Sequence, residues 1–272
     1  MLSVFRILLT NDDGLESLGI RILTETLSKD KELFVRVIAP SSEKSAVAKS
    51  LTFHKPLRLV SIKKEKNVEI YEITGTPADA VLFGVTYKEF EKPNLVISGI
   101  NLGLNLCMHS ILTSGTVAAA IEASIQGIPA IAMSMETKKQ YWFSTTQTEI
   151  YKEVIEEIAK FVTDLVKTIK VKGFPQGIDI LNINFPENYK YGREIKVTRP
   201  CKSRFVNYPE KRLDPRGVPY FWIAGNEIDN IPENTDLKAI KHGFVSVTPI
   251  VISEIVPEEK IDYMKNFLKD SF

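Results

Sequence analysis

The start of the chain alternates between strand-like and helix-like patterns. Residues 5–10 and 33–39 are apolar runs, the first ending in a polar turn and the second at Pro40. Between them, apolar residues recur at helical spacing from Leu18 to Leu27. A continuous apolar run is typical of a strand covered on both faces. A strand, a helix and a strand in this order predict a parallel sheet with a right-handed crossover, and so an α/β fold.

Similar patterns continue along the chain. Two apolar segments flank a lysine-rich turn and predict a β-hairpin over residues 57–73. Thr76, Pro77 and Asp79 have the spacing of a helix start, with Thr76 as the N-cap. Further strands are expected at 95–98, 129–135, 178–183 and 244–249, and further helices at 115–126, 149–170 and 261–268.

The composition of the chain changes after Pro186. Residues 186–234 are rich in proline, asparagine, tyrosine and charge, and hold only short strand-like pieces. We interpret them as an extended β-rich arm or an insertion. The chain thus divides into a core of residues 1–185, an arm of residues 186–234, and a strand and helix in residues 235–272 that return to the core.

The overall charge excludes several classes of partner. The formal net charge is +1 and the sequence pI is about 7.7, so neither nucleic acid nor a membrane surface is an expected partner. No apolar run reaches the roughly 18 residues that a membrane helix needs.

Two distant cysteines, Cys107 and Cys201, form no disulfide framework and no CxxC motif. The N-terminus lacks the cleavage pattern of a signal peptide, so a cytoplasmic protein is expected.

Two adjacent carboxylates, Asp12 and Asp13, follow the first predicted strand. In open parallel sheets, ligands bind at the carboxyl ends of the strands. Two like charges side by side are unfavourable unless a cation or a shared proton offsets them. Hard divalent ions such as Mg²⁺ and Mn²⁺ prefer oxygen ligands of this kind. The pair therefore predicts a divalent-metal site, with an ordinary turn and helix cap as the structural alternative.

Two other loops at the same predicted edge carry groups that bind anions. One includes Gly103, where the backbone can approach a ligand closely, and Asn105, which offers an amide. The other places Ser114, Gly115 and Thr116 at a helix N-terminus, a ready anion site, although both hydroxyl residues are also ordinary caps. A carboxylate-bound metal beside an anion site fits phosphoryl chemistry. The residues themselves therefore favour hydrolysis of phosphate monoesters.

Several segments in a fixed order carry a resemblance to a known family. They are ILLTNDDG (7–14), the AP…S stretch (39–45), GTPADAV (75–81), SGINLGLN (98–105), SGTVAAAIEA (114–123) and TDLKAIKHGFVSVTP (235–249). The NDDG motif alone is weakly specific, but together these motifs span most of the chain. With them, the chain resembles the SurE family of survival-protein nucleotidases.

The resemblance implies a 5′/3′-nucleotidase that uses one Mg²⁺ or Mn²⁺ ion to hydrolyse nucleoside monophosphates, and family members also look capable of releasing phosphate from short polyphosphate. The fold it implies is a three-layer α/β/α Rossmann-like core with a mostly parallel sheet and a C-terminal extended arm, assembled into homodimers or homotetramers. The residues it implies are metal ligands at Asp12, Asp13, Ser45 and Asn101, and phosphate-binding positions at Gly103, Asn105, Ser114, Gly115 and Thr116.

The loop before Ser114 departs from the family pattern. Family members usually carry an acidic pair and an aromatic residue there, whereas residues 107–113 read CMHSILT. His109 lies in this loop and is the histidine closest to the proposed site. Because the loop differs, its contacts with substrate and the base preference do not carry over.

The expected mechanism is attack of a water molecule on phosphorus, with Asp12 or Asp13 orienting or deprotonating that water. The rival from another class is a metal-binding regulatory module like a response-regulator receiver, which has no hydrolase activity. A receiver needs a phospho-acceptor aspartate after a later strand, where this chain has Asn101. A haloacid-dehalogenase-type phosphatase is a second alternative, but its Asp-x-Asp pair has a spacer that this chain lacks.

Overall fold

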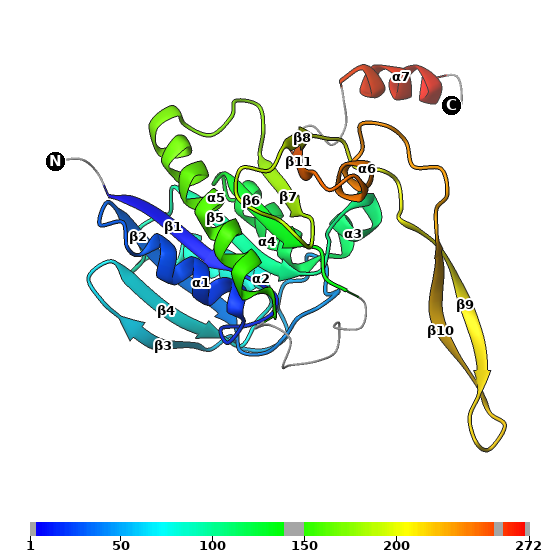
Figure 1. The fold of residues 1–272 in the computed structure, drawn as a ribbon, viewed down its shortest axis with the longest axis horizontal. Coiled ribbons are helices and arrows are strands. Elements are labelled where there is room, and N and C mark those ends of the chain that lie inside the picture. The colour runs from blue at the N-terminus through cyan, green and yellow to red at the C-terminus, as the bar shows by residue number, and fades with distance from the viewer. Residues whose placement is uncertain (1–3, 139–149, 253–257, 270–272) are drawn as a thin grey trace.

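The computed structural model describes residues 4–138, 150–252 and 258–269, which form an α/β fold around one large sheet (Figure 1). The sheet consists of nine strands among these residues: β1 (Phe5–Thr10), β2 (Leu33–Pro40), β3 (Leu59–Lys64), β4 (Val68–Ile73), β5 (Leu95–Leu102), β6 (Ala130–Met135), β7 (Ile180–Phe185), β8 (Ile195–Val197) and β11 (Val245–Ile250). Their order is β3-β4-β2-β1-β5-β6-β7-β11-β8. Neighbours from β4 to β7 run parallel, whereas β3 and β11 pair antiparallel with β4 and β7.

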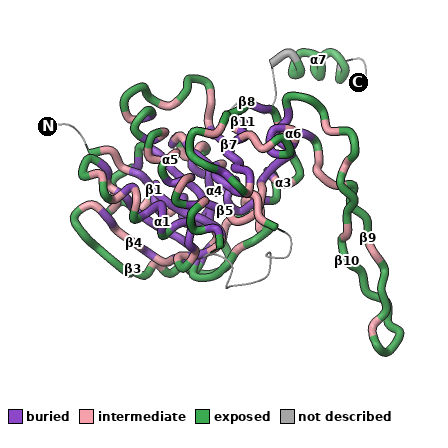
Figure 2. Tube along the Cα trace, viewed as in Figure 1, coloured by how far each residue is buried: buried purple, intermediate pink, exposed green. Residues whose placement is uncertain are grey.

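Helices cover both faces of this sheet, so the predicted α/β fold is confirmed. The helices that pack on it are α1 (Leu18–Leu27), α2 (Pro77–Thr86), α4 (Gly115–Ile125) and α5 (Lys152–Lys172). The residues of β1 alternate between two cores: Ile7 and Leu9 pack in the core under α1 and α5, and Leu8 packs in the core under α2 and α4. Figure 2 shows the buried residues concentrated in these central strands. The apolar runs read from the sequence are therefore strands buried on both faces.

Local signals in the sequence correctly identify most elements. β3 and β4 form the predicted hairpin. Thr76 Oγ1 accepts from the Asp79 N–H at 3.1 Å, and Asp79 Oδ2 accepts from the Thr76 N–H at 2.8 Å, which is the predicted cap of α2.

The expectation that His109 lies in a loop is wrong, because α3 (Cys107–Thr113) forms there. The helix α6 (Asp236–Lys241) was also not predicted; both helices are too short for periodicity to reveal them. Residue 149, the expected start of the long helix, lies outside the described residues.

A second, two-stranded sheet projects from the core as an arm (Figure 1). It pairs β9 (Phe205–Leu213) with β10 (Pro219–Glu227) in an antiparallel hairpin. Most of its residues are exposed (Figure 2), as are the described side chains of α7 (Glu258–Lys269).

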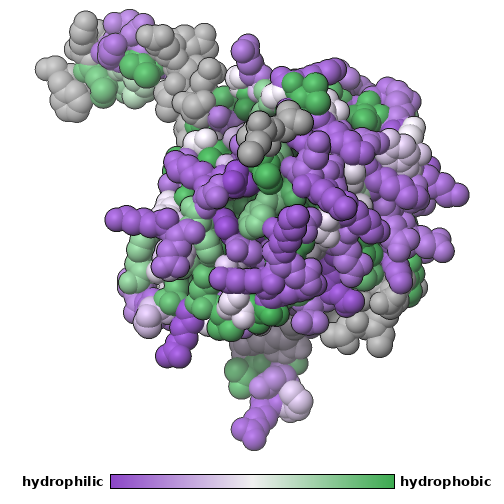
Figure 3. Space-filling view, turned by 90° about the vertical axis from the view of Figure 1, so that its left-hand side faces the viewer, coloured by the Kyte–Doolittle hydropathy of each residue, from purple (hydrophilic) through white to green (hydrophobic). Residues whose placement is uncertain are grey.

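None of the described helices combines the length and the apolar character that a bilayer span requires. On the face of the core shown in Figure 3, hydrophilic side chains predominate and apolar ones are scattered among them.

Candidate active site

The carboxyl ends of β1 and β5 lie side by side in the middle of the large sheet. Thr10 at the end of β1 is paired with Ser98 of β5. From this pair the sheet extends through β2 and β4 on one side and through β6 and β7 on the other. Ligands of open α/β sheets bind at such a switch point. The Asp12–Asp13 turn directly follows β1, and Asn101 lies near the end of β5, so two of the predicted loops meet here.

Asn11 shapes the turn that carries the two aspartates. Its side-chain oxygen accepts from the Gly14 N–H at 3.1 Å, and its Nδ2 donates to the Gly14 carbonyl at 2.9 Å and to Ser17 Oγ at 2.7 Å. Gly14 has a φ of 93°, and a Cβ at this position would lie 3.2 Å from the Pro40 carbonyl oxygen. A glycine therefore suits the point where the turn passes the loop after β2. Asn11 was not among the predicted site residues, although an asparagine ahead of Asp-Asp-Gly is a turn signal.

Asp12 is buried against the N-terminus of α4. Thr116 Oγ1 donates to Asp12 Oδ1 at 2.5 Å, and the Thr116 backbone N–H also stabilises the carboxylate. A negative charge is favourable at this end of a helix. The Lys44 N–H donates to the Asp12 carbonyl oxygen at 2.7 Å. A Cβ on Gly115 would lie 2.9 Å from the Asp12 Cβ and 3.1 Å from the Lys44 carbonyl oxygen, so three segments meet where residue 115 has no side chain.

Asp13 has a buried carboxylate oxygen, Oδ2, with no hydrogen-bond partner among the described residues. Burial raises the pKa of Asp13 to about 8, with further contributions from the charges of Asp12 and Glu43, while a backbone N–H of Leu102 opposes the rise. Burial likewise raises the pKa of Asp12. Charged carboxylates so close together, and one oxygen without a donor, fit a bound cation that offsets the repulsion.

Ser45 lies in the loop after β2, and Asn101 lies near the end of β5, where a loop had been predicted. The Ser45 hydroxyl is exposed and donates to Glu43 Oε1 at 2.5 Å, and the neighbouring Lys44 is tied to Asp12 by its backbone. Asn101 Nδ2 donates to the Gly103 carbonyl oxygen at 2.7 Å, which leaves its Oδ1 as the available ligand atom. Two carboxylates together with hydroxyl and amide oxygens are a donor set that suits Mg²⁺ or Mn²⁺.

Asn105 is held by a network of buried amides. Its Nδ2 donates to Ser134 Oγ at 2.8 Å, and its backbone N–H donates to Asn184 Oδ1 at 2.9 Å. Its carbonyl oxygen accepts from Asn182 Nδ2 at 2.9 Å and from Asn184 Nδ2 at 3.3 Å. Asn182 and Asn184 were not among the predicted site residues. Their spacing could have indicated a role, because two asparagines two residues apart in a buried strand lie on the same face of the sheet.

The Ser114 hydroxyl accepts from the Val117 N–H at 3.1 Å and caps α4. The Gly103 N–H donates to the Met135 carbonyl oxygen at 3.0 Å. His109 is exposed on α3, and its backbone N–H donates to the Lys202 carbonyl oxygen. Of the residues predicted to bind phosphate, Thr116 contacts Asp12 directly, Asn105 is anchored behind the loop, and Ser114 supports the helix start.

A cavity of about 700 Å³ lies at the opposite edge of the sheet, where β1, β2 and β4 begin. Arg6, Lys29, Phe34 and Glu89 are among the residues that line it. None of the predicted site residues does so, because they follow the strands rather than precede them. The chemistry of the two aspartates, rather than the size of this cavity, therefore locates the candidate active site.

The fold and the site together define an α/β protein with a parallel sheet and an acidic site at its switch point. Residues 7–207 match the family model described as survival protein SurE. The chain therefore belongs to the SurE family, and the resemblance seen in its motifs is confirmed.

Several relatives are similar to this chain over nearly its whole length. A 5′-nucleotidase SurE of Thermoanaerobacter sp. (strain X514) is 45% identical over 247 residues, which cover 90% of this chain and 91% of the relative. A 5′-nucleotidase SurE of Archaeoglobus fulgidus is 40% identical and covers 91% of each chain. The crystal structure of the SurE protein from Aquifex aeolicus superposes with a TM-score of 0.75 and 38% identity, and covers 96% of this chain and 99% of that chain.

Proposed function

We propose that this chain is a divalent-metal-dependent phosphomonoesterase that hydrolyses nucleoside monophosphates to nucleoside and phosphate. The observation that carries the proposal is the pair of buried Asp12 and half-buried Asp13, in which the buried Asp13 Oδ2 has no hydrogen-bond partner among the described residues. The names of the relatives, 5′-nucleotidase SurE, support the substrate class. Short polyphosphate is included in the proposal because its terminal phosphoryl group offers the same oxygens.

In this proposal, Asp12, Asp13, Ser45 and Asn101 hold one Mg²⁺ or Mn²⁺ ion. When bound, the ion supplies charge that stabilises the phosphoryl oxygens and lowers the pKa of a coordinated water. Residues at Gly103–Asn105 and Ser114–Thr116 bind and orient the phosphate group. Water attacks phosphorus, the bond from phosphorus to the nucleoside oxygen breaks, and that oxygen gains a proton. One of the two aspartates orients the attacking water and accepts its proton.

We also propose that the chain divides into a core of residues 1–185, an arm of residues 186–234 that mediates homodimer or homotetramer formation, and a returning segment of residues 235–272. The support is the hairpin β9–β10, on which Phe221, Trp222 and Ile223 are exposed by 59%, 59% and 77%. Consecutive large apolar residues left exposed on a projecting hairpin mark an interaction site.

The proposed activity is tested by phosphate release from a panel of nucleoside monophosphates and short polyphosphate, with Mg²⁺, with Mn²⁺ and with a chelator. We expect metal-dependent release that the substitution Asp12→Asn abolishes. Release that is equal in the chelator would contradict the metal assignment. A stable phospho-protein formed from a small phosphodonor, with no release from any substrate, would favour a receiver-like regulatory module instead.

A further inference from the structure

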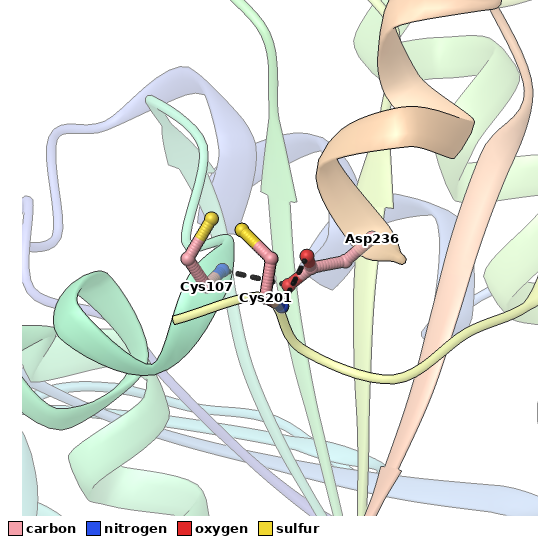
Figure 4. Close-up of side chains that lie close together, drawn as sticks. All are labelled: Cys107, Cys201 and Asp236. Carbon is pink, nitrogen blue, oxygen red and sulfur yellow. Dashed lines mark hydrogen bonds between the residues drawn. The ribbon is translucent and has the colours of Figure 1, made fainter. Parts of the chain in front are cut away.

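The two cysteines of the chain meet in the fold although they are far apart in sequence. Cys107 begins α3, and Cys201 lies between β8 and β9, at the base of the arm. Their sulfur atoms and a carboxylate oxygen of Asp236 lie within 4.8 Å of one another. Figure 4 shows the two sulfur atoms side by side, on the side away from the hydrogen bonds to the carboxylate. Both residues are buried, and neither belongs to the candidate active site.

Asp236 positions the backbones of both cysteines. Its Oδ2 accepts from the Cys107 N–H at 2.6 Å, and its Oδ1 accepts from the Cys201 N–H at 3.1 Å and from the Leu237 N–H at 2.7 Å. Because both oxygens already accept hydrogen bonds from N–H groups, the carboxylate is a weak ligand for a metal ion. Its role in the structure is to hold the two thiol-bearing residues next to each other.

Cys107 also has an unusual backbone conformation. Its φ is 62°, in the left-handed region where glycine is favoured over residues with a Cβ. Although glycine would fit this backbone conformation better, the residue here is a cysteine, and its sulfur lies next to that of the buried Cys201. The pair is thus a juxtaposition of two nucleophilic groups that the proposed phosphatase chemistry does not use.

We propose that Cys107 and Cys201 are a disulfide-forming pair that joins the start of α3 to the base of the arm when the protein meets a peroxide. The sulfur of Cys201, which is 5% exposed, attacks the peroxide oxygen and becomes a sulfenic acid with release of water. The sulfur of Cys107 then displaces the sulfenic oxygen as a second water. In sum, two thiols and one hydrogen peroxide give one disulfide and two waters.

The disulfide constrains both the folded and the unfolded chain. α3 lies between Asn105 and Ser114, so the bond links the segment that carries the predicted phosphate-binding residues to the arm. A cross-link between residues so distant in sequence restricts the unfolded ensemble and raises stability. Burial raises the pKa of both thiols, with the larger effect on Cys107, so the reaction is slow compared with that of an exposed thiol.

The experiment uses the full-length reduced protein treated with hydrogen peroxide. Because the chain has two cysteines, a thiol count in denaturant reads the reaction directly. We expect the count to fall from two to none, the mass to fall by about 2 Da, and peptide mapping to recover a Cys107–Cys201 cross-link within one chain. The melting temperature is expected to rise by roughly 5 °C or more and to return on addition of dithiothreitol.

Two variants serve as matched controls. Cys201→Ser removes one thiol, and Cys107→Gly removes the other while it favours the left-handed backbone at that position. Neither is expected to gain thermal stability with peroxide. Three results would overturn the proposal: two thiols that remain after treatment, a cross-link between chains, or a zinc ion that copurifies with the protein and protects both thiols from the peroxide.

Discussion

At the scale of single residues, the two aspartates after β1 differ in their surroundings. Asp12 receives hydrogen bonds from Thr116, whereas Asp13 Oδ2 has no hydrogen-bond partner among the described residues. Burial of the Asp13 carboxyl, together with the charge of Asp12, raises the pKa of Asp13 to about 8, so a charged carboxylate at this position is unfavourable in the metal-free protein. A cation that binds the folded state alone would stabilise it.

The substitution Asp13→Asn tests this interpretation through stability. We expect the metal-free variant to be more stable than the wild type at neutral pH by about 1–3 kcal/mol, because folding then buries a neutral amide in place of a carboxyl group whose charged form is disfavoured by burial and by Asp12. Mn²⁺ is expected to raise the melting temperature of the wild type and not that of the variant. The measurement is thermal unfolding with Mn²⁺ and with a chelator. Asp262→Asn, at an exposed position on α7, is the control. If Mn²⁺ still raised the melting temperature of Asp13→Asn, the ion would bind at a site that does not include Asp13.

Gly115 lies where the start of α4, the Asp12–Asp13 turn and the loop after β2 pack closely together. A Cβ there would lie 2.9 Å from the Asp12 Cβ and 3.1 Å from the Lys44 carbonyl oxygen. We expect Gly115→Ala to displace Asp12 and to lower kcat/KM for nucleoside monophosphates on the order of 10²-fold, because small misplacements of catalytic groups are costly. The protein should still fold, with a loss of about 1–3 kcal/mol.

Gly84→Ala is the matched control for that measurement. Its Cβ would crowd the Leu8 side chain at 2.7 Å, in the core under α2 and away from the aspartates. A loss of stability without a comparable loss of kcat/KM is expected for Gly84→Ala. An equal loss of activity in both variants would mean that packing in general, rather than the position of Asp12, sets the rate.

At the scale of elements, β7 supports the loop that follows β5. Asn182 and Asn184 point from a strand that is otherwise apolar and bind the backbone of Asn105. Buried amides of this kind are stable only when their hydrogen bonds are satisfied. The strand therefore positions the loop next to the aspartates as well as completing the sheet.

The substitution Asn184→Ala removes two of these hydrogen bonds and leaves the Asn105 N–H without its acceptor. We expect the free energy of unfolding to fall by about 1–3 kcal/mol. We also expect KM for nucleoside monophosphates to rise, because the predicted phosphate-binding loop is no longer fixed. Denaturant unfolding and steady-state kinetics are the measurements. Asn230→Ala, at an exposed position, should change neither quantity, and an unchanged KM in Asn184→Ala would contradict a role for the loop in substrate binding.

At the scale of the whole molecule, the arm exposes apolar side chains that the core does not cover. The substitution of both Phe221 and Trp222 by serine is expected to shift the protein to a smaller assembly, because it removes apolar surface from the proposed contact. Light scattering coupled to size-exclusion chromatography measures the mass. Val171→Ser, at an exposed apolar position on α5, is the control. A monomeric wild type would contradict the proposed oligomer.

Local patterns in the sequence determined much of this protein. The apolar runs predict the central strands, the helical spacing predicts α1, and the Thr76–Asp79 pair predicts the start of α2. These elements can be predicted because each pattern involves residues only a few positions apart in the sequence. The acidic pair after β1 was also visible, since its place follows from the strand before it.

The tertiary structure alone decided which distant groups meet. The position of Thr116 on Asp12 and of Asn184 on Asn105 depends on β5, β6 and β7 lying in order beside β1. The same holds for Cys107 beside Cys201, which requires α6 to bring Asp236 to both backbones. No local pattern encodes these contacts, because strand order is set by the packing of the whole sheet and its helices rather than by the residues of any one segment.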